Sequence, residues 1–259
     1  TFFRIFVILA FIFIFILAYL SFFGFKTDRF NEFIKTQIIK EDERLNIDIK
    51  NIFIKLNIKE TSLSLNSKDI DIFILKEKQK IANVDILIDA LSLITGENKI
   101  KKIIINSDRN EISNLLNFIR IYKINIPVLY LQNSIKKGQI IYNATINLKN
   151  NNFNQIELKG KINNTELNIL NKQKYENISL DFNFKNNNLK ISNLKLKYKN
   201  LNFSSKKIDT IIGDKIISFK GDLKNLFNST LLSNLLNRDI KKYIDEKVLL
   251  SANSIFEFE

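Results

Sequence analysis

The hydrophobic residues of this chain follow two patterns, one continuous and one alternating. The continuous run covers residues 5–25, holds no charged residue and is flanked by Arg4 and Lys26. A helix of about 20 apolar residues matches the roughly 30 Å hydrocarbon core of a bilayer. The run is longer than the apolar region of a signal peptide, and no small-x-small cleavage motif follows it. We therefore predict an uncleaved, single-pass membrane anchor over residues 1–26, with a cleaved signal peptide and a buried core helix as alternatives.

The segment after the anchor, residues 27–40, has helical spacing. Thr27 and Asp28 can cap such a helix. Its apolar positions share one face: Phe30, Phe33, Ile34 and Ile38. That face can lie in the membrane interface, or it can pack on the following sheet as a lid, and the sequence favours neither arrangement.

From Leu45 onward most apolar residues alternate with polar ones, which is typical of antiparallel strands with one apolar and one polar face. The parity of the apolar positions switches near Lys50 and Asn51, so we expect a bulge or a turn there. Pro127 marks a strand start, and Lys137 with Gly138 forms a hairpin turn. The predicted strands are 45–49, 52–58, 63–65, 70–74, 100–105, 128–131, 140–148, 156–162, 167–169, 178–184, 189–198, 201–203, 217–219 and one that begins at Val248.

A few segments return to helical spacing. We predict a short helix over residues 84–94 that ends at Gly96, a natural left-handed cap. A second helix is predicted over residues 108–121, with a capping pair in Asp108 and Glu111. A third covers residues 222–236, and one further turn lies near residues 241–246. No linker rich in Pro, Gly or Ser divides residues 27–259, and the alternation is still running at the last residues, which indicates the N-terminal portion of a longer protein.

The charge of the chain is strongly basic, with 40 Lys and Arg against 27 Asp and Glu and a net charge of +13. This balance suits a nucleic-acid or anionic-lipid partner. The lysines are scattered singly, however, and the Phe residues follow the apolar face instead of interleaving with the charge as RNA stacking requires. We therefore predict no nucleic-acid partner, and an Ile-, Lys- and Asn-rich composition explains most of the charge.

Candidate catalytic chemistry is sparse in this sequence. The chain has no Cys and no His, which removes thiol nucleophiles, the commonest general base and the usual zinc sites. Ser134 and Lys137 have the spacing of some acyl enzymes but lack companion motifs. The carboxylate pairs Asp69 with Asp71 and Asp85 with Asp89 are interpreted as solvated faces. We predict that the protein is not an enzyme and binds no metal or cofactor; an anchored hydrolase is the minor alternative.

The apolar faces of the strands allow two architectures. They can close on each other as a dry β-sandwich, which would suit an anchored, non-enzymatic scaffold or assembly factor that binds other envelope proteins. Alternatively, the sheet curls without closing and offers its apolar face to lipid. Burying a CH₂ group is worth about 0.8 kcal/mol, so a chain of ~16 carbons costs about 12 kcal/mol in water. An anchored apolar trough would remove much of that cost.

The order of elements resembles the N-terminus of the AsmA-like family, which includes the TamB and YhdP types of Gram-negative bacteria. The resemblance rests on the anchor, the short helix, the paired strands, DALSLITG at 89–96, IKKIIIN at 100–106 and IKKGQIIY at 135–142. It covers residues 1–150 well, and the remainder only in its general alternating pattern.

The resemblance implies a mainly β fold, a curled antiparallel sheet that forms a groove with a few covering helices. It also implies an inner-membrane protein with its bulk in the periplasm, which shields phospholipid acyl chains during transport to the outer membrane and envelope biogenesis. No catalytic residues carry over. We expect the groove to be lined by Ile47, Ile49, Ile54, Leu56, Ile72, Ile74, Tyr142, Ile146, Leu180, Phe182 and Phe184.

Overall fold

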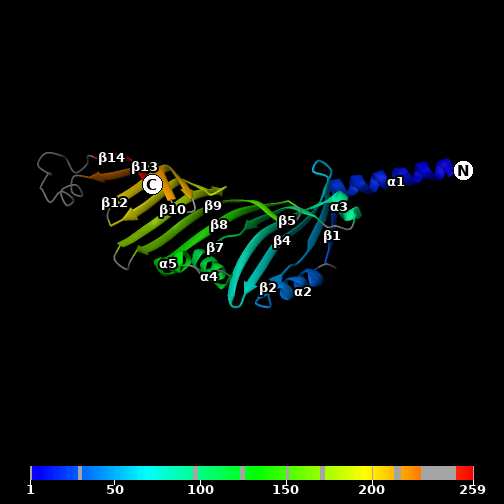
Figure 1. Cartoon of the computed structure of the whole chain (residues 1–259), viewed down its shortest axis with the longest axis horizontal. Coiled ribbons are helices and arrows are strands. Elements are labelled where there is room, and N and C mark those ends of the chain that lie inside the picture. The colour runs from blue at the N-terminus through cyan, green and yellow to red at the C-terminus, as the bar shows by residue number, and fades with distance from the viewer. Residues whose placement is uncertain are drawn as a thin grey trace, which may run out of the picture. The chain divides into compact units, whose positions relative to one another are not determined.

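The structure of the chain is a computed structural model, and strands dominate it (Figure 1). It describes residues 2–28, 31–95, 99–122, 126–149, 152–169, 173–199, 201–212, 217–228 and 249–258. The chain divides into two compact units: unit 1 is Thr1–Asp108 with Asn143–Ile156, and unit 2 is Arg109–Tyr142 with Glu157–Glu259. Strand β8 contributes residues to both.

The helices are α1 (Phe2–Phe22), α2 (Asn31–Glu41), α3 (Ala90–Thr95), α4 (Ile112–Tyr122) and α5 (Ile126–Ser134). The strands are β1 (Phe25–Thr27), β2 (Leu45–Asp48), β3 (Ile52–Asn57), β4 (Ser62–Ile74), β5 (Glu77–Asp89), β6 (Ile100–Ser107), β7 (Asn110–Glu111), β8 (Ile135–Lys149), β9 (Asn152–Ile169), β10 (Gln173–Lys185), β11 (Asn188–Tyr198), β12 (Leu201–Ile212), β13 (Ile217–Asn228) and β14 (Leu249–Phe258).

All of these strands join one antiparallel sheet, which curls but does not close. Its order is β1-β3-β4-β5-β6-β8-β9-β10-β11-β12-β13-β14, with β2 paired to β4 and β7 paired to β8. Neighbours in the sheet are therefore mostly neighbours in sequence, as in a meander. The predicted fold class, a mainly β protein with a curled antiparallel sheet and a few helices, is confirmed.

Helix α1 is the predicted apolar segment. Its span Phe3–Phe22 has 20 residues, is long and apolar enough to cross a membrane, and is not buried by the rest of the structure. The helix ends earlier than predicted because Gly24 adopts a φ of 73°, a left-handed conformation that glycine tolerates best. A Cβ on Gly24 would also lie 2.6 Å from Phe53 Cε1. Phe25 then starts β1 instead of extending the helix.

The predicted helix over residues 27–40 is confirmed in part. Thr27 is the last residue of β1, which pairs with β3, so it does not belong to a helix. Helix α2 begins at Asn31. The Asn31 amide donates hydrogen bonds to the carbonyls of Ile49 (2.9 Å) and Lys50 (3.0 Å). Helix α2 lies against β2 (Figure 1). The hydrogen bonds of Asn31 therefore fix the two residues that follow this strand.

The predicted irregularity near Lys50 and Asn51 is a break between β2 and β3. Both strands pair with the same long strand β4, and Asp69 on β4 has a φ of 52° at the corresponding level. The chain therefore continues in one direction through the break instead of turning back. Strand β4 also joins the two strands predicted over 63–65 and 70–74.

The predicted helix over residues 84–94 is wrong for its first part. Residues up to Asp89 belong to β5, which is paired on one side with β4 and on the other with β6. Only Ala90–Thr95 is helical, and Gly96 lies outside the described residues. Pairing on both sides overrides the helical spacing, because it provides hydrogen-bond partners for the backbone N–H and C=O groups of the strand.

In unit 2 the predicted strand over residues 128–131 and the hairpin turn at Lys137 and Gly138 are wrong. Residues Ile126–Ser134 form α5, and Ile135–Lys149 form one uninterrupted strand, β8. Pro127 lies in the first turn of α5, where its missing N–H costs no hydrogen bond. The predicted helix over 108–121 is present as α4, which starts later, at Ile112.

The last helical predictions also need correction. Residues 222–228 belong to strand β13, which pairs with β12 and β14. The remainder of the segment predicted as helix, and the turn near 241–246, lie outside the described residues. The final predicted strand is confirmed as β14.

Candidate functional site

The candidate site of unit 1 is an apolar face that runs across consecutive strands. In direct register, Ile54 of β3 lies beside Leu65 of β4, followed by Ile86 of β5, Ile103 of β6 and Ile146 of β8. Paired residues point to the same side of a sheet. We call these five residues the central row. Aliphatic neighbours flank it on the same face: Leu56, Leu63, Ile88, Val84, Ile105 and Ala144.

The central row has the length of a lipid tail. Four inter-strand spacings of about 4.8 Å make it about 19 Å long. One leaflet of a bilayer holds an acyl chain within about 15 Å, half the hydrocarbon core. All five side chains are half-buried, so each keeps apolar surface in contact with solvent. This surface is therefore available to an apolar ligand.

The opposite face of the same strands is polar. The Ser64 hydroxyl donates a hydrogen bond to Asp85, and the Asn66 amide donates to Asn83 Oδ1 at 2.7 Å. Three apolar residues depart from this pattern. Ile104 points to the polar side, where its register partners are Asp85 and Thr145. Leu87, which pairs with Ser64, and Phe53, which pairs with Asn66, lie on the same side. The two adjacent isoleucines of β6, Ile103 and Ile104, thus lie on opposite faces.

Unit 2 has its own apolar face. Phe184 of β10 pairs with Leu158 and Leu189, and Phe182 pairs with Gly160 and Ile191. Ile191 in turn pairs with Ile208 of β12. A bulge at Asn177, whose φ is 53°, shifts the register within β10 between Glu176 and Ser179.

Helix α4 covers part of this face. Ile112 and Leu116 of α4 and Ile140 of β8 are buried together, with Leu115, Ile135, Tyr142, Ile162 and Phe182 packed against them. Burial raises the pKa of the Tyr142 phenol above its ordinary value. Gly160 lets the Phe182 ring approach, since a Cβ there would lie 2.6 Å from Phe182 Cζ. This end of the face is packed by protein.

The residues predicted to line a groove fall into separate groups. Ile54 and Ile146 belong to the central row, and Leu56 flanks it. Ile47 pairs with Ile72 where β2 meets β4, and Ile49 lies in the break after β2. In unit 2, Leu180, Phe182 and Phe184 are half-buried on β10, and Tyr142 packs against α4.

One predicted lining residue is closed to a ligand. Ile74 at the end of β4 has 0% of its surface exposed, so it is packing for the β2–β4 end. Three members of the central row were not among the predicted lining residues: Leu65, Ile86 and Ile103. For Ile86, the alternation of Val84, Ile86 and Ile88 could have indicated a strand. Leu87 lies between them and gives the segment a helical spacing as well.

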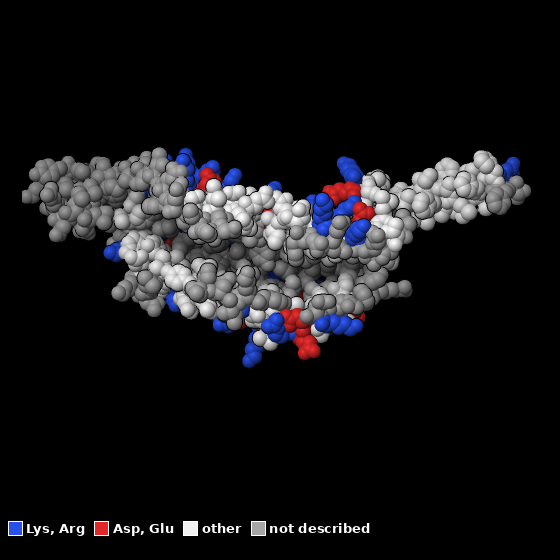
Figure 2. Space-filling view, viewed as in Figure 1, with Lys and Arg blue, Asp and Glu red and all other residues white. Residues whose placement is uncertain are grey.

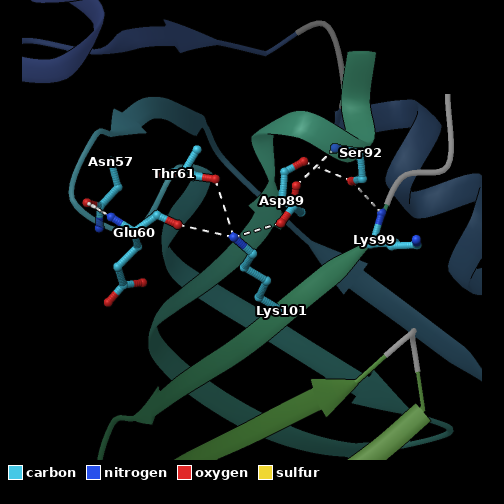
Figure 3. A network of polar contacts seen from close by, with 7 residues as sticks. All are labelled: Asn57, Glu60, Thr61, Asp89, Ser92, Lys99 and Lys101. Carbon is cyan, nitrogen blue, oxygen red and sulfur yellow. Dashed lines mark hydrogen bonds and ion pairs between the residues drawn. The ribbon is translucent and has the colours of Figure 1, made fainter. Parts of the chain in front are cut away.

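A polar network fixes one end of the apolar face of unit 1 (Figure 3). Lys101 Nζ lies 2.7 Å from Asp89 Oδ2 and donates to the Glu60 carbonyl at 3.1 Å. Asp89 also caps α3 by accepting from the Ser92 backbone N–H at 2.9 Å. The Lys101 ammonium, followed by the Ser92 hydrogen bond, holds the pKa of Asp89 below its usual value. These contacts join the β3–β4 turn, α3 and β6.

The candidate catalytic residues take part in local contacts. Ser134 is buried at the end of α5, and Lys137 Nζ lies 2.7 Å from Glu166. Asp71 pairs with Lys78 at 2.7 Å, and Asp69 occupies the irregular position of β4. The exposure of Asp69 agrees with its interpretation as part of a solvated face.

Comparison of the sequence with protein-family models, with curated proteins and with solved structures found no match.

Proposed function

We propose that this chain is a membrane-anchored, non-enzymatic protein that shields lipid acyl chains on the apolar face of its sheet. In this proposal α1 crosses the inner membrane once and the sheet lies in the periplasm, as in the AsmA-like family that the sequence resembles. The role would be phospholipid transport toward the outer membrane. The observation that carries the proposal is the central row, an aliphatic band of acyl-chain length whose members keep exposed surface.

The free energy available from this face is large enough to matter. A saturated chain of ~16 carbons that lies on the sheet with one side in contact recovers about half of its transfer free energy, about 6 kcal/mol. The flanking rows, about 7 Å away along the strands, widen the contact on both sides. The face therefore lowers the cost of carrying a tail through water without burying it completely.

A photocrosslinking experiment with a matched pair tests this proposal. A photoreactive benzophenone side chain replaces Ile103 in one variant and Ile104 in the other, both in the full chain in native membranes. The two isoleucines are adjacent on β6 and both half-buried, but they lie on opposite faces. We expect lipid adducts from position 103 and many fewer from position 104.

Other outcomes would contradict the proposal. Lipid adducts in equal amounts from both positions would mean that the apolar face has no preference for lipid. Protein adducts from position 103, with no lipid, would favour the anchored scaffold that the sequence also allows. Extraction at alkaline pH tests the anchor separately: the full chain should stay with the membrane, and a variant without residues 2–22 should not.

A further inference from the structure

A basic groove lies on the polar side of unit 1, next to the end of α1. Its cavity has a volume of about 440 Å³ and is lined by Lys26, Lys50, Asn51, Phe53, Asn66, Lys68 and Asp69. This volume falls within the range of about 300–1,000 Å³ that is typical of small-molecule sites. The strand register places Lys26, Phe53 and Asn66 in one row across β1, β3 and β4.

The charge of the groove is unbalanced. Three ammonium groups face one carboxylate, Asp69, and all four side chains are exposed. In the described part of the chain none of the three lysines forms an ion pair, whereas Lys78 and Lys101 of the same unit do. The groove therefore has unneutralised positive charge available for an anion.

The position of the groove relative to α1 indicates which anion. Tyr19, Phe22, Phe23 and Phe25 are exposed aromatic residues at the end of the apolar helix, and aromatic side chains are enriched at membrane–water interfaces. Along α1 itself, Figure 2 shows charge only at the N-terminal tip. Lys26 follows Phe22 by four residues, which span at most about 14 Å. A headgroup layer of about 5–8 Å begins where the hydrocarbon ends, and a lysine side chain can extend toward it.

We propose that this groove binds the headgroup of an anionic phospholipid at the surface of the membrane that holds α1. The phosphate would lie among Lys26, Lys50 and Lys68, with the Phe53 ring, 36% exposed, against the glycerol end of the tails. The inference rests on the proposed membrane insertion of α1 but not on acyl-chain binding by the apolar face.

Native mass spectrometry of the purified full chain, titrated with phosphatidylglycerol and with phosphatidylcholine, tests the proposal. The two lipids carry the same acyl chains, so binding of tails to the apolar face contributes equally to both. Each lysine near an anionic headgroup is worth about fivefold in affinity. We expect the variant K26Q/K50Q/K68Q to lose the preference for phosphatidylglycerol, on the order of 100-fold if the three act independently.

Two further variants make the test specific. K190Q/K195Q/K206Q removes the same charge from exposed lysines of unit 2 and should leave the preference in place. Asp69→Asn removes the one carboxylate of the groove and should strengthen phosphatidylglycerol binding about fivefold. Asparagine tolerates the left-handed conformation of this position, and a misfolded protein would not show a gain.

Two results would overturn the proposal. One is an equal loss of preference in the two triple variants; the other is equal affinity of the unmodified chain for both lipids. Either result leaves the crosslinking at Ile103 unaffected, so the headgroup site and the apolar face can fail independently.

Discussion

The contact between Gly160 and Phe182 gives a sharp prediction for the Gly160→Ala variant. In an ordinary strand position this change stabilises a protein by about 0.5–1 kcal/mol, because glycine is the more flexible residue. Here the new Cβ would lie 2.4 Å from the Ile141 carbonyl oxygen and 2.6 Å from Phe182 Cζ. The ring can tilt, but the oxygen belongs to the backbone of β8, so the strand itself must move. Overpacking of this kind costs about 1–3 kcal/mol, and we expect a net loss of about 2 kcal/mol.

Urea unfolding of the full chain in detergent, followed by circular dichroism, measures this loss as a lower midpoint. Lys161→Ala is the matched control: Lys161 is the next residue, its side chain is 69% exposed, and it makes one weak ion pair at 3.6 Å with Asp181. The control should change stability by less than about 0.5 kcal/mol. Adding Phe182→Leu to Gly160→Ala should recover part of the loss, since the ring is one of the two obstacles. A Gly160→Ala protein as stable as the unmodified chain would refute the close packing of β8, β9 and β10.

Three further predictions concern local contacts. Leu116→Ala in α4 should destabilise unit 2 by about 2–4 kcal/mol in urea unfolding, because Leu116 is 7% exposed, whereas Ile119→Ala on the same helix, at 38% exposure, should cost much less. The side-chain hydrogen bond from Arg44 lowers the pKa of Asp42 to about 2; its stabilising contribution is therefore complete above about pH 4 and lost as the pH falls through about 2, and a carboxyl NMR titration with a midpoint near 4 would contradict it. Asp89→Ala should speed hydrogen exchange at the start of α3 more than Asp89→Asn does, because asparagine still caps a helix.

The periodic part of the sequence was sufficient to predict a mainly β protein with antiparallel strands. It allowed both a closed sandwich and an open curled sheet, and the curled sheet was implied by the family resemblance. Alternation between apolar and polar residues identified most strands, and the uncharged run identified α1. The errors occurred where the local pattern fits two structures. Leu87 has helical spacing to neighbouring apolar residues, yet it lies in β5 and is 5% exposed. Residues 222–228 have the same ambiguity, and pairing with β12 and β14 decides it. Long-range pairing of this kind is not visible in a short window of sequence.

The candidate site was harder to predict than the fold. Ile54 and Ile146 were expected to line a groove, but the central row also needs Leu65, Ile86 and Ile103. Its composition depends on the register of each strand pair, and a shift of one residue would exchange the two faces. Ile103 and Ile104 are identical in type and adjacent in sequence, so only their partners on β5 and β8 distinguish them.

The junction at Gly24 has a mechanical consequence. Only Phe23 and Gly24 separate the last residue of α1 from the first residue of β1, and the N–H groups of both donate to the Tyr19 carbonyl, at 2.8 and 3.2 Å. With α1 in a bilayer, the connection between the helix and the sheet spans at most about 11 Å. The first strands could then neither swing away from the lipid surface nor rotate independently of α1, so the position of the helix in the membrane would also set the position of this edge of the sheet.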